Sequence, residues 1–145
     1  MSEQTTSSIV VAAEPAAVMA VIADFASYPD WAKGVKSTEI IGGEVDGRAQ
    51  QVHFVLDVAP IKDSYTLAYV WSGDRRVTWS LAESQFLRSL DGSYDLRAVP
   101  GGTEVTYQLA LDLNIPIIGM LKRKGEKVII ETALSGLKKR VESLA

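Results

Sequence analysis

The sequence predicts an α+β fold in which one long C-terminal helix lies across a curved antiparallel sheet. Three observations predict it. Apolar and polar residues alternate through most of residues 35–112, the pattern of strands with one buried face. A short strand and two short helical segments precede this region, and a helical pattern covers about 116–144. That last helix is the only predicted element long enough to cover the apolar face of the sheet.

The length and composition predict one domain over residues 1–145. A chain of 145 residues is close to the commonest domain size, and 47% hydrophobic with 23% charged residues is typical of globular proteins. The absence of cysteine excludes disulfides, thiolate nucleophiles and Cys-ligated metal sites. A single histidine, His53, excludes a multi-histidine metal site within the chain. A metal site built from carboxylates alone stays open. We expect no metal and no cofactor.

The net charge bears on nucleic-acid binding, whereas the N-terminus and the lack of a long apolar run predict a cytoplasmic protein. The 15 Lys and Arg residues against 18 Asp and Glu residues give a net charge of −3, which argues against nucleic acid as the main partner. Residues 1–8 are polar and lack the basic start and apolar run of a signal peptide. No stretch approaches the roughly 18 apolar residues of a membrane span.

The N-terminal region is predicted as strand, helix and short helix. Residues 8–12 form the strand, and Pro15 is suited to the first turn of the helix that follows. One stripe of that helix carries apolar residues at i, i+3, i+4 and i+7: Val18, Val21, Ile22 and Phe25. Ser27 is expected to cap the second helix, with Pro29 in its first turn and Trp31 as its anchor.

The alternating region is predicted as a series of strands. The strands are expected at 35–41, 48–58, 65–71, 76–81, 89–97 and 104–112, with turns at 42–47, 72–74 and 100–102. The dipeptide Asp91-Gly92 allows two interpretations, a two-residue hairpin turn or a bulge within a strand. The apolar register continues through Leu90, Gly92 and Tyr94, which favours the bulge.

The long helix carries two apolar stripes. The first half has Ile118, Leu121, Gly125, Val128 and Thr132, and the second has Ile130, Leu134, Leu137, Val141 and Leu144. At about 100° per residue the two stripes lie on nearly opposite sides of the helix. The helix therefore either buries different faces along its length or breaks near Gly125, and the sequence leaves both open.

The order of these elements resembles the START-like superfamily, also called SRPBCC, whose architecture is the helix-grip fold. Within it, the sequence is most similar to the polyketide cyclase/dehydrase-like branch. The resemblance covers essentially the whole chain and is carried by residues 9–18 (IVVAAEPAAV), 24–31 (DFASYPDW), 79–81 (WSL), 92–96 (GSYDL) and 102–107 (GTEVTY). It implies a hydrophobic cavity between the sheet and the long helix.

The strand alternation places seven aromatic residues on the covered face. They are Phe54, Tyr65, Tyr69, Trp71, Trp79, Tyr94 and Tyr107. With Leu109, Leu121, Val128 and Thr132 we expect them to line an apolar pocket, in which tyrosine hydroxyls orient a ligand. The small residues Gly125, Thr132, Ser135 and Gly136 are expected to leave space above the sheet. The alternative is that these aromatic residues form an ordinary core.

No residue of the predicted strands is a convincing catalyst. Acid–base catalysis needs a titratable group inside the pocket. The strand carboxylates fall on the outward face: Asp57, Asp91, Asp95, Glu104 and Asp112. His53 also alternates outward, where we expect it to be solvated or hydrogen-bonded, although a slip of one residue in register would turn it inward. We therefore expect no catalytic residue.

Three basic clusters stand out, at 75–76, 122–124 and 138–140. We interpret them as solvated surface, and Glu126 and Glu131, which interrupt the first helical cluster, favour this interpretation. The alternative is a transient contact with an anionic membrane surface, or with a phosphate or carboxylate of a ligand.

These observations predict a protein that carries or senses a hydrophobic small molecule of the lipid, polyketide or isoprenoid class, without catalysis. The resemblance implies two alternatives. One is a polyketide cyclase or dehydratase. The other is a protein-interaction module of the ubiquinone-binding or ribosome-associated type, to which residues 28–31 are also similar.

Overall fold

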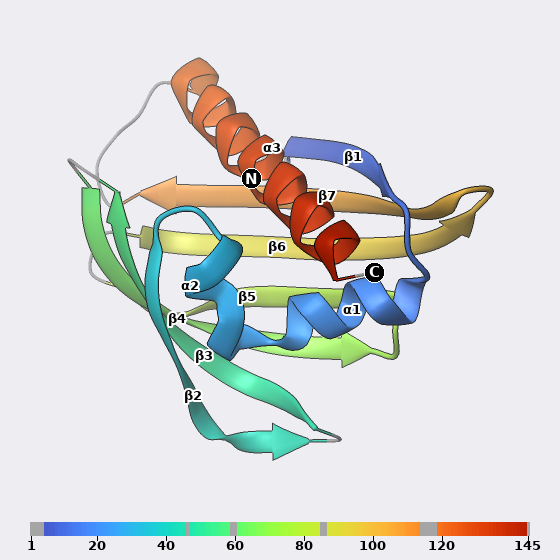
Figure 1. The fold of residues 1–145 in the computed structure, drawn as a ribbon. Coiled ribbons are helices and arrows are strands. Elements are labelled where there is room, and N and C mark those ends of the chain that lie inside the picture. Colours follow the sequence, from blue (N-terminus) through green and yellow to red (C-terminus); the bar gives the residue numbers. More distant parts are fainter. Residues whose placement is uncertain (1–4, 46, 59–60, 85–86, 114–118, 145) are drawn as a thin grey trace.

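The computed structural model describes residues 5–45, 47–58, 61–84, 87–113 and 119–144, and it confirms the predicted order of elements (Figure 1). The elements are β1 (Thr5–Val11), α1 (Pro15–Ala23), the 3-10 helix η1 (Phe25–Ser27), α2 (Tyr28–Trp31), β2 (Val35–Val45), β3 (Arg48–Val58), β4 (Ile61–Ser72), β5 (Arg76–Ser84), β6 (Leu87–Val99), β7 (Gly102–Leu113) and α3 (Gly119–Ser143).

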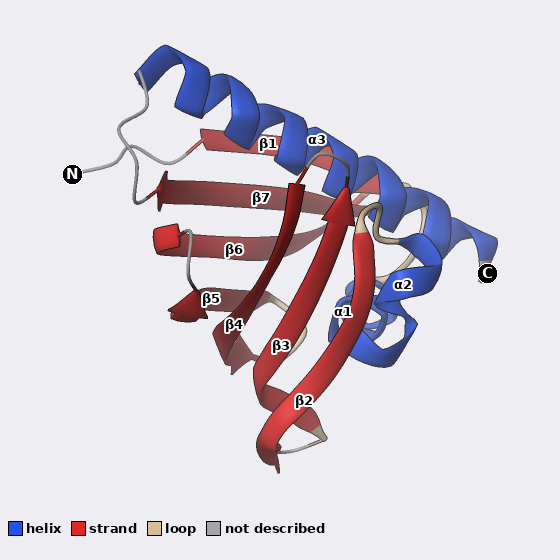
Figure 2. Cartoon of the chain, turned by 90° about the vertical axis from the view of Figure 1, so that its left-hand side faces the viewer, coloured by secondary structure: helices blue, strands red, loops and turns tan. Residues whose placement is uncertain are grey.

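The seven strands form one antiparallel sheet in the order β1-β7-β6-β5-β4-β3-β2. The first strand therefore lies beside the last, and β1 and β2 are the two edges. Figure 2 shows the sheet curving, with α3 across its concave side near β1 and β7 and the shorter helices at one end. The core lies between the concave face and these helices.

Strand β2 is longer than the sequence predicts. The predicted turn at 42–47 begins too early, because β2 stays paired with β3 as far as Val45. The register shifts between Ile41 and Glu44, where Gly42 and Gly43 have φ values of +78° and +98°. Two glycines at positive φ here form a bulge within the strand rather than its end.

Strand β6 runs unbroken through Asp91-Gly92, so the hairpin alternative is wrong. Gly92 pairs in register with Trp79 of β5 and Leu109 of β7, and the register shift between β6 and β7 lies near Leu87 instead. A Cβ added at Gly92 would lie 2.5 Å from Cζ2 and Nε1 of Trp79. This glycine is therefore not a bulge either, but the point where an indole ring approaches the backbone closely.

The short helices are held by side-chain hydrogen bonds other than the predicted Ser27 cap. Ser27 makes no side-chain capping hydrogen bond with α2, so the predicted N-cap is wrong. Instead, the Tyr28 hydroxyl donates to the Ile22 carbonyl at 2.6 Å, and Thr38 Oγ1 donates to the Phe25 carbonyl at 2.7 Å. The first bond joins α2 to α1, and the second joins η1 to β2.

Helix α3 is continuous through Gly125, so the alternative of a break is wrong. The other alternative, that the two halves of the helix bury different faces, is also wrong. From residue 123 onward, where burial is described, one face of the helix is buried, by Glu126, Ile130, Leu134, Leu137 and Val141. On the first predicted stripe, Gly125, Val128 and Thr132 are exposed. A straight helix presents one side to the sheet, and the larger apolar residues of the second half determine which side this is.

Candidate ligand-binding site

A continuous series of aromatic rings covers the concave face from the short helices to β7. The rings are Phe25, Tyr28, Trp31, Phe54, Tyr65, Tyr69, Trp71, Trp79, Tyr94 and Tyr107, and neighbouring centroids lie 4.7–6.1 Å apart. All seven strand aromatics that the alternation placed on the covered face belong to this series. Five of them are buried, while Tyr65 and Trp71 are half-buried.

The tightest part of this aromatic face is the group of Trp79, Tyr94 and Tyr107. The two tyrosine rings meet edge to face at 4.7 Å, and Trp79 contacts them at 5.3 and 5.4 Å. Edge-to-face packing places the positive rim of one ring on the negative face of the next. Leu109, which was predicted beside them, is 2% exposed.

The tyrosine hydroxyls are the polar groups of this face. The Tyr28 hydroxyl donates to the Ile22 carbonyl, but those of Tyr69, Tyr94 and Tyr107 have no hydrogen-bond partner among the described residues. Among the residues that the structure describes, Trp31 Nε1 is the one fully enclosed side-chain nitrogen or oxygen without a hydrogen-bond partner. The three partnerless hydroxyls are therefore not fully enclosed, and each reaches space that a water molecule can touch.

Burial controls the protonation of these phenols. Loss of solvation raises the pKa of Tyr69, Tyr94 and Tyr107 well above the usual tyrosine value, and the neighbouring tyrosines raise it further. All three hydroxyls are consequently protonated at neutral pH. Each can donate one hydrogen bond to an acceptor that comes within reach.

The contribution of α3 differs from the prediction. Val128 is 60% exposed and Thr132 is also exposed, so neither lines the covered face. Leu121 lies in α3, but its side chain is outside the described residues. Of the small residues expected to face the sheet, Gly125, Thr132 and Ser135 are exposed. Gly136 faces inward, where a Cβ would lie 3.3 Å from the Trp31 carbonyl oxygen.

The structure reveals a buried carboxylate that the sequence analysis interpreted as part of a solvated face. Glu126 is 0% exposed. Its Oε1 accepts a hydrogen bond from Thr5 Oγ1 at 2.6 Å, and its Oε2 accepts one from the backbone N–H of Leu111 at 2.8 Å. The pairing of β1 with β7 begins at Thr5 and Leu109, so Glu126 bonds an N–H just beyond that pairing. The sequence did contain a signal for this burial, because Glu126 lies one turn before Ile130 and so on the same side of the helix as the second apolar stripe.

His53 lies on the outer face, as the alternation predicts. Its Nδ1 is 2.9 Å from Oγ1 of Thr66, the residue opposite it on β4. The strand carboxylates also lie on that face, and three of them form ion pairs: Asp95 with Arg76 and Glu104 with Arg97, each at 2.8 Å, and Asp112 with Arg88 at 3.8 Å. Within the described ranges, no three His, Asp or Glu side chains gather as a metal site would require.

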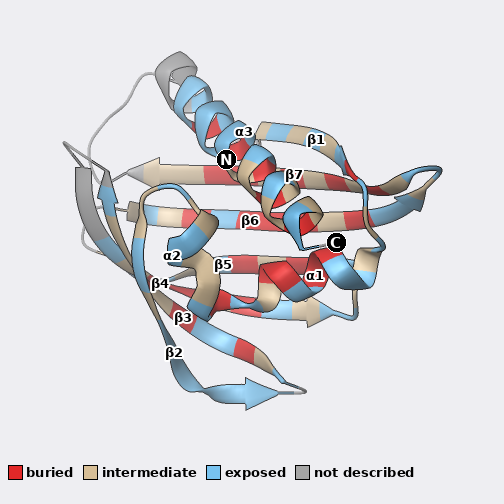
Figure 3. Ribbon diagram, viewed as in Figure 1, coloured by how far each residue is buried: buried red, intermediate tan, exposed pale blue. Residues whose placement is uncertain are grey.

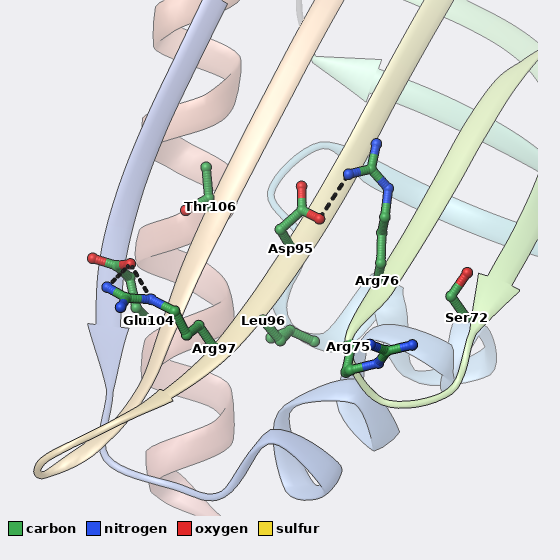
Figure 4. A pocket seen from close by; sticks show the side chains of 8 residues that line it. All are labelled: Ser72, Arg75, Arg76, Asp95, Leu96, Arg97, Glu104 and Thr106. Carbon is green, nitrogen blue, oxygen red and sulfur yellow. Dashed lines mark hydrogen bonds and ion pairs between the residues drawn. The ribbon is translucent and has the colours of Figure 1, made fainter.

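A shallow hollow of about 490 Å³ lies on the outer face of the sheet, behind the aromatic face (Figure 4). It is lined by Ser72, Arg75, Arg76, Asp95, Leu96, Arg97, Glu104 and Thr106. Figure 4 shows the Arg76–Asp95 and Arg97–Glu104 pairs along it, with α3 on the far side of the strands. The predicted basic cluster at 75–76 thus lies in this hollow, where a carboxylate already neutralises Arg76.

Among the helices described here, none is long and apolar enough to cross a membrane.

Comparison with known proteins gives the family. The model of the family described as polyketide cyclase / dehydrase and lipid transport matches residues 2–144. No curated protein sequence matches the chain.

Solved structures show the same fold at low sequence identity. A START superfamily protein from Mycobacterium smegmatis superposes with a TM-score of 0.90 at 19% identity, covering 98% of this chain and 99% of that one. A protein from Thermus thermophilus gives 0.81 at 23% identity, covering 99% of each chain. The Zhui aromatase/cyclase from Streptomyces sp. R1128 gives 0.76 at 16% identity, covering 98% and 94%. The chain therefore belongs to the polyketide cyclase/dehydrase and lipid-transport family and has the START-like fold.

Proposed function

We propose that the protein binds an apolar small molecule against the aromatic concave face, beneath α3, and carries or senses it without transforming it. The observation that carries this proposal is the combination of a continuous aromatic face with three protonated, partnerless hydroxyls, those of Tyr69, Tyr94 and Tyr107. A ligand site of this kind is largely apolar, with a few polar groups that fix orientation.

The chemistry of these groups defines the ligand class. Aromatic rings favour a flat or flexible hydrocarbon frame, as in polyketides, isoprenoids and lipids. The hydroxyls of Tyr69, Tyr94 and Tyr107 are donors whose pKa is raised by burial, so they match a hydrogen-bond acceptor such as a carbonyl oxygen. We therefore expect an apolar molecule that carries at least one such oxygen.

The absence of a working acid or base supports binding rather than turnover. In the described part of the strands, the buried residues of the concave face include no His, Arg, Asp or Glu. Both carboxylate oxygens of Glu126 are engaged by Thr5 and Leu111. Phenols with a raised pKa donate hydrogen bonds but do not accept protons near neutrality. Cyclase or dehydratase activity would need a group that this face does not provide.

Native mass spectrometry of the freshly purified protein, followed by solvent extraction, tests the proposal. We expect an apolar adduct that carries a carbonyl or similar oxygen. Titration of the emptied protein with the extracted molecule should then be saturable. Tyr107→Phe and Tyr94→Phe keep the rings but remove the donor, so each should weaken binding by about five- to tenfold, the value of one buried hydrogen bond.

Tyr28→Phe is the matched control, because its hydroxyl is already bonded to the Ile22 carbonyl. It should lower stability while changing affinity less than about twofold. A protein that carries no apolar adduct, and that also shows no saturable binding of the fluorescent apolar probe anilinonaphthalene sulfonate, would contradict the proposal.

A further inference from the structure

Charge is divided unevenly between α3 and the rest of the molecule. This helix carries seven of the 15 Lys and Arg residues but only three of the 18 Asp and Glu residues. Its net charge is thus +4, while the other residues sum to −7. One of its three acidic residues, Glu126, is buried and hydrogen-bonded, so it contributes nothing to the exposed surface. Helix α3 is the basic side of an acidic protein.

The same helix exposes large apolar side chains next to its basic residues. Val128 is 60% exposed and Ile129 is 45% exposed, directly after exposed Lys127. Arg123 and Lys124 are exposed one turn earlier. We call these five residues the basic–apolar patch. Figure 3 shows exposed residues along the described part of α3.

The burial of the opposite side of α3 fixes the orientation of the patch. Glu126 and Ile130 face the sheet. At about 100° per residue, Val128 lies on the far side of the helix from both, so the sheet cannot cover it. Glu131 is the exposed carboxylate nearest the patch in sequence, and no ion pair joins it to a basic residue of the described chain. The patch keeps its positive charge.

We propose that the basic–apolar patch docks α3 on an anionic lipid bilayer. Exposed Lys and Arg attract an anionic surface, and the apolar side chains beside them insert at the boundary between head groups and acyl chains. Nucleic acid would use the charges but would leave Val128 and Ile129 without an apolar environment. The acidic remainder of the molecule is repelled by the same surface, which orients α3 toward it. This docking goes beyond the proposed ligand binding and does not depend on it.

Co-sedimentation of the whole protein with lipid vesicles tests the proposal. We expect binding to vesicles of equal parts phosphatidylglycerol and phosphatidylcholine, but not to phosphatidylcholine alone. Binding should weaken as salt is raised, because screening shortens the range of charge attraction. The double variant Lys124→Glu/Lys127→Glu should lower affinity by about tenfold or more, and Val128→Ser should lower it by about threefold or more.

Two matched controls separate docking from general charge and hydrophobicity. Lys33→Glu/Lys36→Glu makes the same charge change at exposed residues elsewhere, and Val70→Ser removes a valine that is 66% exposed on the outer face of the sheet. Each should change vesicle affinity by less than about twofold. Circular dichroism verifies folding of each variant. The proposal is overturned by equal binding to both vesicle types, by binding to neither, by controls that lose as much affinity as the patch variants, or by tighter binding to a DNA duplex than to the anionic vesicles.

Discussion

The indole ring of Trp79 in β5 lies directly over the backbone of Gly92 in β6. The two residues are opposite each other in the ladder, and a Cβ at Gly92 would lie 2.5 Å from Cζ2 and Nε1 of the ring. The missing side chain lets Trp79 reach the edge-to-face group with Tyr94 and Tyr107. A single hydrogen at position 92 therefore shapes the centre of the aromatic face.

Gly92→Ala should destabilise the protein by about 1–3 kcal/mol, the usual cost of overpacking a filled core. The reason is steric, because Gly92 does not have a positive φ. In a Trp79→Leu background the ring is gone, so the same substitution should become neutral or stabilising by about 0.5–1 kcal/mol, since alanine is favoured over glycine within a strand. Urea denaturation of the four proteins in this double-mutant cycle measures both effects. Equal costs in the two backgrounds would show that Trp79 is not the cause.

Glu126→Gln should destabilise the protein by about 1–3 kcal/mol, because both hydrogen bonds lose the charge of their acceptor. Thr5 Oγ1 and the Leu111 N–H both donate to the carboxylate, whereas a neutral amide would offer its oxygen to the Leu111 N–H and its NH₂ group to the Thr5 hydroxyl, which would have to accept. Hydrogen exchange at the Leu111 amide should also accelerate. Glu131→Gln, an exposed change one turn away, is the control and should cost less than about 0.5 kcal/mol. A similar cost for both variants would refute the structural role of Glu126.

Alkaline titration should leave four of the five tyrosines protonated while the protein stays folded. Burial raises the pKa of Tyr28, Tyr69, Tyr94 and Tyr107 above the ordinary value of 10.0. A raised pKa in the folded state means that stability is fully present below about pH 10 and is lost as pH rises further. The tyrosinate absorbance of these four residues should therefore rise in one step with loss of near-ultraviolet circular dichroism. Gradual ionisation of three or more tyrosines in the folded protein would contradict this.

The contact between α3 and β1 should weaken in acid. The hydrogen bond from Lys138, followed by that from the Ala12 N–H, lowers the pKa of Glu142 from 4.5. A lowered pKa means that the stabilisation is present above about pH 4.5 and is lost as pH falls through the folded-state value. Glu142→Gln should thus lower the thermal midpoint at neutral pH, and its difference from the native protein should shrink on acidification. Glu39→Gln, at an exposed position of β2, serves as the control; a pH-independent difference for Glu142→Gln would count against the mechanism.

Alternation alone was enough to place the aromatic face, because a strand offers each side chain one of two directions. Phe54, Tyr69 and Trp79 lie on the concave side as the period of two predicts, and His53 lies on the outer side. The same rule located the outward carboxylates. Local pattern determined these features, since a slip in register would have exposed a whole row of rings.

The features that the pattern missed depend on long-range contacts. Asp91-Gly92 has the sequence of a turn, and only the ring of Trp79, distant in the chain, explains why glycine stands within a strand. Helix α3 had two plausible apolar faces, because Val128 and Thr132 belong to one stripe and Ile130 and Leu134 to another.

The sequence by itself determined the order of elements, the direction of the strand side chains and the resemblance to a family. The tertiary structure decided which side of α3 faces the sheet, and with it the burial of Glu126 and the exposure of Val128. The physical reason is that a helix can turn about its own axis at little local cost. Its orientation is set by the surface on which it packs, which in this fold is built from strands at both ends of the chain.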